Sequence, residues 1–389
     1  VSRSVSRTVA LTVLLALVAG ACSSTASTVD AADPAPSEAA PNGDLDPELS
    51  AAMDRIVASV LTGIELDDLD ILAAGADARV GWFLQDLARL LAGSPVEVSI
   101  VGAYTELTGR GVDPFTPWPD MANQMISADT PAPPGYLGWK RDLFTLVEPR
   151  WEPFFADDSD VDWRHVSWGG VLIDDRPSGA TEPCTRGCIP SLDDPVMTDA
   201  DGGDWYADDR IVFGVVIGDE ARAYPKHQME VHEMVNDTVG GRRIGLPYCT
   251  LCGSAQAYVL DDLDGFTPTL RTSGLLIRSN KMMFDLETMS LIDTFTGEAS
   301  TGPLAAAGVN LTPISVVTST WGDWKQEHPD TTIVAEDGGI GREYADNPLG
   351  ARDADGPIFP IGDVDPRLPV SEPVLGFQTD DGRWFAVPV

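Results

Sequence analysis

The apolar residues that follow position 46 recur three or four residues apart, which is the spacing of amphipathic helices. Asp46 followed by Pro47 is typical of a helix N-cap and a first helical residue. Two more runs with this spacing cover residues 80–93 and 96–107. The pattern predicts three short helices in series within residues 47–150, arranged as a small bundle or a solenoid-like scaffold.

From about Trp163 onward, apolar and polar residues alternate as they do in strands. Residues 210–225, "RIVFGVVIGDEARAYP", predict two strands joined by a Gly-Asp turn. A similar pair of segments recurs at 374–388, which predicts a related β-unit used twice, although two unrelated hairpins would give the same echo. Residues 151–389 are therefore expected to form a mainly β domain built of hairpins. Together with the helical region this predicts an α+β fold.

The N-terminus has the pattern of an export signal. Two arginines precede a short apolar run at residues 9–18, and small residues then lead to Cys22. The run is too short to span a bilayer, so residues 1–21 are predicted to be a signal peptide. Small residues directly before a cysteine resemble the lipobox of bacterial lipoproteins; an ordinary cleaved signal is the alternative. Residues 22–46 are rich in Ser, Ala, Pro and Asp and are predicted to be a disordered tether.

Composition limits the partners of the folded part. The chain has 61 acidic and 25 basic residues and a formal net charge of -36. Such a surface repels nucleic acid and anionic lipid headgroups, so no nucleic-acid partner is expected. Contact with the cell membrane is expected only through a lipid on Cys22, which would hold the protein on the extracytoplasmic face. The sequence does not identify protein partners.

Two cysteine pairs follow the tether. Cys184 and Cys188 have the spacing C-x3-C, whereas Cys249 and Cys252 have the spacing C-x2-C. In an oxidising compartment an even number of cysteines most often forms disulfides. A C-x2-C pair is more often redox-active or metal-bound, because a bond across so small a ring stabilises little. Gly253 gives the second pair the form of a metal knuckle, since glycine adopts a positive φ readily.

His232 is the candidate third ligand for a metal at the C-x2-C pair. Residues 226–235 indicate a short helix that would place His232, Glu233 and Asn236 on one face. Glu233 or Asp237 would then orient the imidazole. The alternative is that His232 and Asn236 cap and hydrogen-bond the next turn. The H-E-x-x-N sequence lacks the second histidine of the H-E-x-x-H zinc proteases, so that class is excluded.

The β region contains four characteristic segments: "ARAYPKHQMEVHEMVND", "GRRIGLPYCTLCGSAQAY", "SGLLIRSNKMMFDLETMS" and "TGEAS". In this order they resemble the bacterial and archaeal family of proteins called DUF3179, whose function is unknown, over about residues 160–389. The resemblance implies that the family pattern is matched at Tyr224, Pro225, His232, Glu233, Asn236, Asp237, Cys249, Cys252, Ser273, Gly274, Ser279, Asn280, Met283 and Asp285.

The chain departs from the family pattern in two places. Thr250 stands where the family usually has proline between its cysteines. Ile292, Asp293 and Thr294 replace a Trp-x-Gln element. If that Trp and Gln line the family's pocket, this chain binds a different ligand or has lost the activity.

The resemblance draws attention to Met283 as a fourth metal ligand. Two thiolates, one imidazole and one thioether form a soft set that favours copper. Core packing is the better interpretation of Met283 alone, because methionine is a common core residue. Four thiolates, with Cys184 and Cys188 added to the C-x2-C pair, would instead suit structural zinc. A separate disulfide between Cys184 and Cys188 is the alternative.

Three functions stay open at this level. The first is a lipid-anchored extracytoplasmic protein with a Cys/His site for a soft metal, used for metal handling or for structure. The second is a thiol–disulfide protein in which the C-x2-C pair cycles. The third is a ligand-binding or hydrolytic domain with structural disulfides, whose pocket is lined by His232, Glu233, Asn280 and Asp285. No nucleophile or substrate is identified, so no enzymatic activity is assigned.

Overall fold

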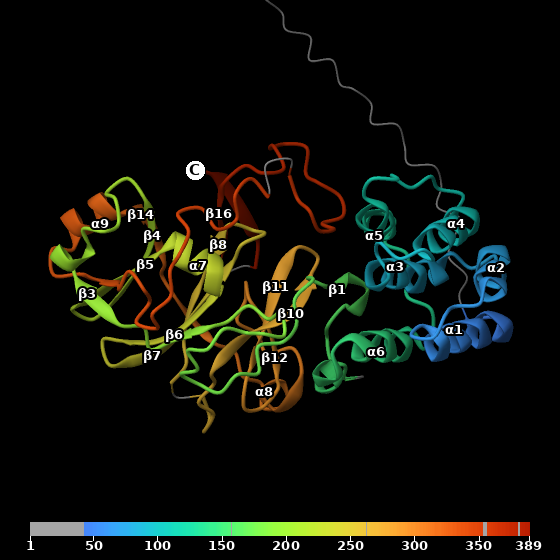
Figure 1. The fold of residues 1–389 in the computed structure, drawn as a ribbon, viewed down its shortest axis with the longest axis horizontal. Helices are drawn as coiled ribbons and strands as arrows, with labels where there is room; N and C mark the ends of the chain where they lie inside the picture. The colour runs from blue at the N-terminus through green and yellow to red at the C-terminus, as the bar shows by residue number, and fades with distance from the viewer. Residues whose placement is uncertain (1–42, 157, 262, 353–355, 380–381) are drawn as a thin grey trace, which may run out of the picture. The chain divides into compact units, whose positions relative to one another are not determined.

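The computed structural model describes residues 43–389, except residues 157, 262, 353–355 and 380–381 (Figure 1). The predicted signal peptide, Cys22 and most of the predicted tether lie outside the described residues. No helix in the described part of the chain has the length and apolar character of a membrane span.

The N-terminal part of the described chain is helical (Figure 1). Asp46 caps the first helix as predicted, since its side chain accepts a hydrogen bond of 2.8 Å from the Glu48 main-chain N–H. The three predicted helices are confirmed as α1, α3 and α4, and α3 packs against α4, α5 and α6. The sequence pattern missed α2, α5 and α6. The bounds are α1 Pro47–Ser59, α2 Leu66–Ala74, α3 Gly81–Leu90, α4 Glu97–Thr108, α5 Pro117–Ser127 and α6 Tyr136–Val147.

The rest of the described chain is mainly β, which confirms the α+β fold. Its sheets have the strand orders β1-β10-β11-β12, β13-β9-β7-β6-β2 with β8 paired to β7, β14-β4-β5-β15-β3, and β16-β17. The bounds are β1 Val166–Trp168, β2 Leu192–Asp193, β3 Met197–Asp199, β4 Ile211–Ile217, β5 Glu220–Pro225, β6 Met234–Val239, β7 Arg242–Cys249, β8 Ser254–Ala255, β9 Ala257–Val259, β10 Leu270–Ile277, β11 Asn280–Asp285, β12 Leu291–Asp293, β13 Thr312–Ile314, β14 Val317–Thr320, β15 Thr332–Val334, β16 Val374–Gln378 and β17 Trp384–Pro388. Short helices α7 Lys226–His232, α8 Gly302–Ala306 and α9 Trp321–Glu327 lie between strands.

Both predicted hairpins are present. β4 and β5 pair antiparallel, with Ile217 opposite Glu220 across the turn. β16 and β17 also pair antiparallel, but they form a sheet of their own, whereas β4 and β5 are the middle of a larger one. The similarity between residues 210–225 and 374–388 is therefore limited to the hairpin and does not include the surrounding sheet.

One apolar core joins the helices to the sheet of β10 and β11. Buried residues from α1 to α6 and from these two strands form a single cluster. Trp151 donates a hydrogen bond of 2.8 Å from its indole N–H to the Ser273 carbonyl, and the rings of Phe154 and Phe284 lie 5.5 Å apart. Packing thus continues across the predicted border near residue 150.

A bulge in β10 shapes the surroundings of the candidate site. The register with β11 shifts between Thr272 and Leu276. Gly274 lies in this bulge with a φ of 82°, and a Cβ there would stand 2.3 Å from the Val171 carbonyl oxygen. Glycine is therefore required for the chain around Val171 to approach β10 this closely.

Candidate functional site

The C-x2-C pair lies at the tip of a tight β-turn. Cys249 is the last residue of β7, and the chain returns as β8 with Ser254 opposite Cys249. Gly253 has a φ of 63°, so the predicted need for glycine after the second cysteine is confirmed. The strands on both sides also agree with the sequence, and no helix begins at the pair.

The two sulfur atoms of the pair are close and unbonded. Cys249 Sγ and Cys252 Sγ lie 2.8 Å apart, and both residues are free thiols. A tetrahedral metal with bonds of about 2.3 Å to each sulfur would hold the sulfurs about 3.8 Å apart. A disulfide would hold them about 2.05 Å apart, which needs a movement of less than about 1 Å. The distance is closer to that of a disulfide than to that of a metal chelate. It therefore favours a dithiol that can form a disulfide.

The two thiols have different surroundings. Cys249 is fully buried, whereas Cys252 is exposed. The pKa of Cys249 is lowered, chiefly because Cys252 donates its S–H to the Cys249 sulfur; burial opposes this, and the main-chain N–H of Lys281 adds to it. The same hydrogen bond and burial raise the pKa of Cys252. Cys249 is therefore the sulfur that carries the negative charge when the pair shares one proton.

A buried lysine and glutamate lie beside Cys249. Lys281 enters from β11 and donates from Nζ to the Glu233 carbonyl oxygen, while its Nζ lies 3.9 Å from Glu233 Oε2. Thr250, between the two cysteines, donates a hydrogen bond of 2.7 Å to Glu233 Oε1. Burial lowers the pKa of Lys281, and the negative charges of Glu233 and Cys249 raise it. The attraction of the ammonium for Cys249 stabilises the thiolate in return.

Side chains of these residues contribute to the lining of a cavity of about 270 Å³. The polar lining is Glu233, Cys249, Thr250, Thr272, Lys281 and Arg352. The remaining walls are mostly aliphatic and come from the loop before β2, the turn after β7, the β10 bulge and residues 358–359. The buried sulfur of Cys249 thus faces a partly open cavity that is also lined by charged side chains.

His232 does not contact the cysteine pair. Its Nδ1 donates to the Pro190 carbonyl oxygen at 2.6 Å, and its Nε2 then accepts from the Tyr344 hydroxyl at 2.7 Å. Burial lowers the pKa of His232 to about 4, so the ring is neutral at pH 7. Among the described residues, no group of three or more His, Cys, Asp or Glu side chains is placed to hold a metal ion. The predicted convergence of His232 with the two thiols is not seen.

Helix α7 is shorter than the sequence indicated. It ends at His232, and Glu233 follows with a φ of 52°, the left-handed conformation of a helix end. Asn236 lies on β6 instead of on the helix. The predicted shared face therefore does not exist, and Glu233 turns toward Thr250 and Lys281 instead. Glu233 is the predicted pocket residue that the structure does place beside the cysteines.

The polar residues of β5 and β6 hold strands together. Asn236 donates to Asp193 Oδ1 at 2.8 Å and exchanges two hydrogen bonds with the Leu270 main chain. Asp237 accepts a hydrogen bond of 2.8 Å from the Tyr224 hydroxyl. None of these side chains lines the cavity. Their hydrogen bonds between strands give them a structural role, which accounts for their place in the family pattern.

Most of the remaining predicted residues also have structural roles. Ser273, in the β10 bulge, donates to the Met282 carbonyl of β11, and Asp285 fixes the turn after β11. Met283 is fully buried in an apolar cluster, so core packing and not metal binding accounts for it. Asn280 alone lies at the site, with its Oδ1 3.8 Å from Cys252 Sγ.

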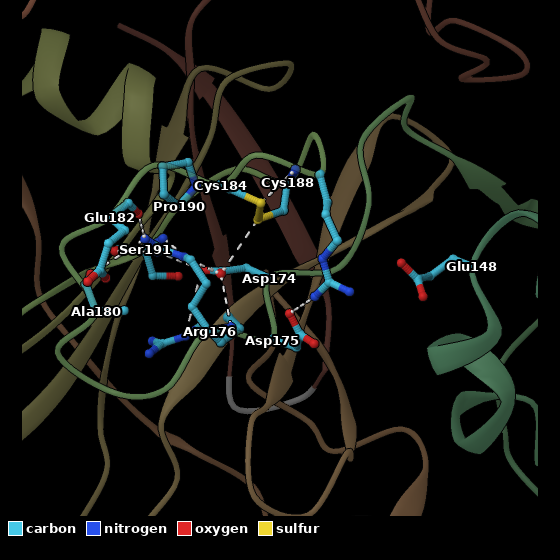
Figure 2. The surroundings of a disulfide bond; sticks show 12 residues. Glu148, Asp174, Asp175, Arg176, Ala180, Glu182, Cys184, Cys188, Pro190 and Ser191 are labelled. Carbon is cyan, nitrogen blue, oxygen red and sulfur yellow. Dashed lines mark hydrogen bonds and ion pairs between the residues drawn. A yellow bond between two sulfur atoms is a disulfide. The ribbon is translucent and has the colours of Figure 1, made fainter.

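The other cysteine pair is a disulfide, Cys184–Cys188 (Figure 2). This outcome agrees with one of the two alternatives for these residues and removes them as extra metal ligands. Figure 2 shows Asp174 beside the bond, with Oδ1 3.6 Å from Cys188 Sγ. Asp174 also accepts hydrogen bonds from Arg176 and from the Ser191 main chain. The disulfide thus belongs to a structural network.

The charge of Glu233 should control the acidity of Cys249. Glu233 raises the pKa of Cys249 by repulsion, so Glu233→Gln should lower that pKa further and move the pH profile of Cys249 alkylation to lower pH, by up to about one unit. The pH dependence of iodoacetamide labelling, with the peptides identified by mass spectrometry, measures the shift. Glu230→Gln, on helix α7 just before Glu233, serves as the control. A shift to higher pH would contradict the assignment.

Fold and site together define an α+β protein with a free dithiol, of which Cys249 lines a cavity, and with a separate disulfide. A protein-family model, described as "Protein of unknown function (DUF3179)", matches residues 186–387. The chain belongs to this family, as the sequence segments indicated. No curated protein and no solved structure matches the chain.

Proposed function

We propose that the protein is a thiol–disulfide exchange protein in which Cys249 and Cys252 cycle between dithiol and disulfide. The observation that carries the proposal is the pair of sulfurs 2.8 Å apart, one buried and one exposed. Such a pair closes with little movement, and only one sulfur is open to a partner.

The asymmetry of the pair favours oxidation of a partner. A substrate thiolate attacks exposed Cys252 Sγ of the disulfide form; a bond forms between these sulfurs, and Cys249 leaves as a thiolate. A sulfur with a lowered pKa leaves faster, and its hydrogen bonds stabilise the reduced protein. A second substrate thiolate then attacks the substrate sulfur of the mixed disulfide, which releases Cys252. The substrate loses two electrons, and the protein pair gains them.

The cellular setting is part of the proposal. Signal-like residues 1–21 and a lipobox-like Cys22 support anchoring on the extracytoplasmic face. The Cys184–Cys188 disulfide supports an oxidising compartment, where structural disulfides persist. Such a compartment supplies thiols of newly exported proteins as substrates and an external oxidant to restore the disulfide.

A single-turnover reaction tests the proposal. The oxidised protein is mixed with a reduced peptide that contains two cysteines, and the products are alkylated and identified by mass spectrometry. We expect one peptide disulfide to form for each Cys249–Cys252 bond that is lost. Absence of transfer, together with stoichiometric copper or zinc in the purified protein that protects both thiols, would instead support the metal function.

A further inference from the structure

The turn between β10 and β11 holds the side chain of Asn280 beside the exposed sulfur of the dithiol. Asn280 is the first residue of β11 and pairs with Ile277 across the turn. The Ser279 hydroxyl, in the turn itself, donates a hydrogen bond of 3.0 Å to the Phe359 carbonyl. Asn280 is 7% exposed, and its Oδ1 lies 3.8 Å from Cys252 Sγ. A buried amide is thus fixed next to the sulfur that the proposed substrate attacks.

The sulfur of Cys252 is surrounded by hydrogen-bond acceptors. Its S–H donates to the Cys249 sulfur, 2.8 Å away. Among the described residues, the other polar atoms within its reach are the Ser279 carbonyl oxygen at 3.5 Å and Asn280 Oδ1 at 3.8 Å. These surroundings stabilise a protonated sulfur. They do not stabilise a thiolate, which needs donors.

The amide of Asn280 holds an unused donor. Its Nδ2 is buried and has no hydrogen-bond partner among the described residues. A buried donor without a partner costs free energy, so its presence at a reactive site needs an explanation. A half turn about the last side-chain bond exchanges the positions of Oδ1 and Nδ2, and the torsion of an amide allows both. The turn brings the donor to Cys252 Sγ and breaks no other hydrogen bond of Oδ1 within the described part of the chain.

One step of the exchange reaction needs a donor at this sulfur. When the second substrate thiolate attacks the substrate sulfur of the mixed disulfide, the bond to Cys252 breaks and its electron pair stays on Cys252. In the dithiol, the hydrogen bond to Cys249, burial, and repulsion by the negative charges of Cys249 and Glu233 raise the pKa of Cys252. A sulfur with a raised pKa leaves slowly. A hydrogen bond to the departing thiolate would offset part of this effect.

We propose that Asn280 is a positioning residue that turns its amide toward Cys252 and donates from Nδ2 to the thiolate released from the mixed disulfide. The amide turns back when Cys252 regains its proton, so that Oδ1 again faces the S–H. The inference rests on the proposed function, because the thiolate at Cys252 arises in the exchange reaction. Asn280 acts through Cys252 and controls how readily this sulfur is released.

The acidity of Cys252 tests the hydrogen bond without any disulfide transfer. In a Cys249→Ser protein, Cys252 titrates without its neighbouring thiol, and the pH dependence of its iodoacetamide labelling reports the thiolate. Adding Asn280→Leu should move this profile to higher pH by about one unit, because a hydrogen bond to the charged form is lost. Asn280→Asp should also move it to higher pH, since a carboxylate repels the thiolate, and it replaces the leucine variant if that one does not fold. Asn310→Asp makes the same change at an exposed residue between α8 and β13 and should leave the profile unchanged.

The rate of exchange tests the role in the reaction. In the protein with both cysteines, Asn280→Leu should slow the single turnover severalfold and cause the peptide–Cys252 mixed disulfide to accumulate. Disulfide transfer by the wild-type protein, together with unchanged labelling profiles in both Asn280 variants, would overturn the positioning role and leave the proposed function standing. A shifted profile in a protein whose wild type transfers no disulfide would support the hydrogen bond and overturn the proposed function.

Discussion

Arg271→Met is expected to lower the free energy of unfolding by about 3–5 kcal/mol, because it leaves buried carboxylates without their cation. Arg271 is 1% exposed and donates to both oxygens of Asp193, at 2.8 and 2.7 Å. Its Nε lies 3.7 Å from Asp174, which is also buried. Urea denaturation at pH 7 measures the loss.

The matched control is an exposed pair of the same kind. Arg367 and Asp365 form an ion pair with side chains 85% and 54% exposed. Arg367→Met should leave the free energy of unfolding almost unchanged, because water screens exposed pairs. If Arg271→Met and Arg367→Met both leave the free energy of unfolding almost unchanged, the Arg271 network does not hold β2, β6 and β10 together.

The second large effect concerns the two thiols. Neither Cys249→Ser nor Cys252→Ser should transfer a disulfide to a peptide, because each lacks half of the pair. The two variants should react at different rates with a peptide whose cysteine is activated as a mixed disulfide with thiopyridine. In Cys249→Ser the exposed Cys252 sulfur attacks the peptide sulfur, thiopyridone leaves, and the peptide–Cys252 adduct accumulates because no second thiol resolves it.

Cys252→Ser should form the adduct much more slowly, since Cys249 is fully buried. Release of thiopyridone, followed by absorbance, gives the rates, and mass spectrometry identifies the adduct. A double variant of Cys184 and Cys188 to Ala should keep wild-type exchange, because their disulfide belongs to a structural network. Faster adduct formation at Cys249 than at Cys252 would reverse the assigned roles.

Local patterns predicted the local structure well. The Asp-Pro helix start, the Gly-Asp hairpin and the glycine after Cys252 are each fixed by neighbouring residues, and each is confirmed. The sequence also identified the C-x2-C pair and Glu233 as a pocket residue. These features depend on short-range chemistry that a single sequence carries.

Features that depend on distant contacts were missed. The helix at His232 was extended too far, because nothing local shows that Glu233 adopts a left-handed conformation. Lys281 lies in an apolar strand forty-eight residues from Glu233, and its one signal was that a lysine stands among buried positions. Tyr344, whose hydroxyl donates a hydrogen bond to His232 Nε2, lies even further along the chain from its partner. Helical spacing made His232 a candidate metal ligand, because the sequence alone does not show that Tyr344 hydrogen-bonds to its ring.

The proposed function requires Cys249 and Cys252 to form a reversible disulfide. The most direct measurement is equilibration of the protein in glutathione buffers of graded potential, followed by acid quenching, alkylation and mass spectrometry of the peptide that contains both residues. We expect a single two-electron transition in which both thiols disappear together. The equilibrium constant between dithiol and disulfide should change about tenfold for each 30 mV. Two thiols that stay alkylatable at every potential would contradict it.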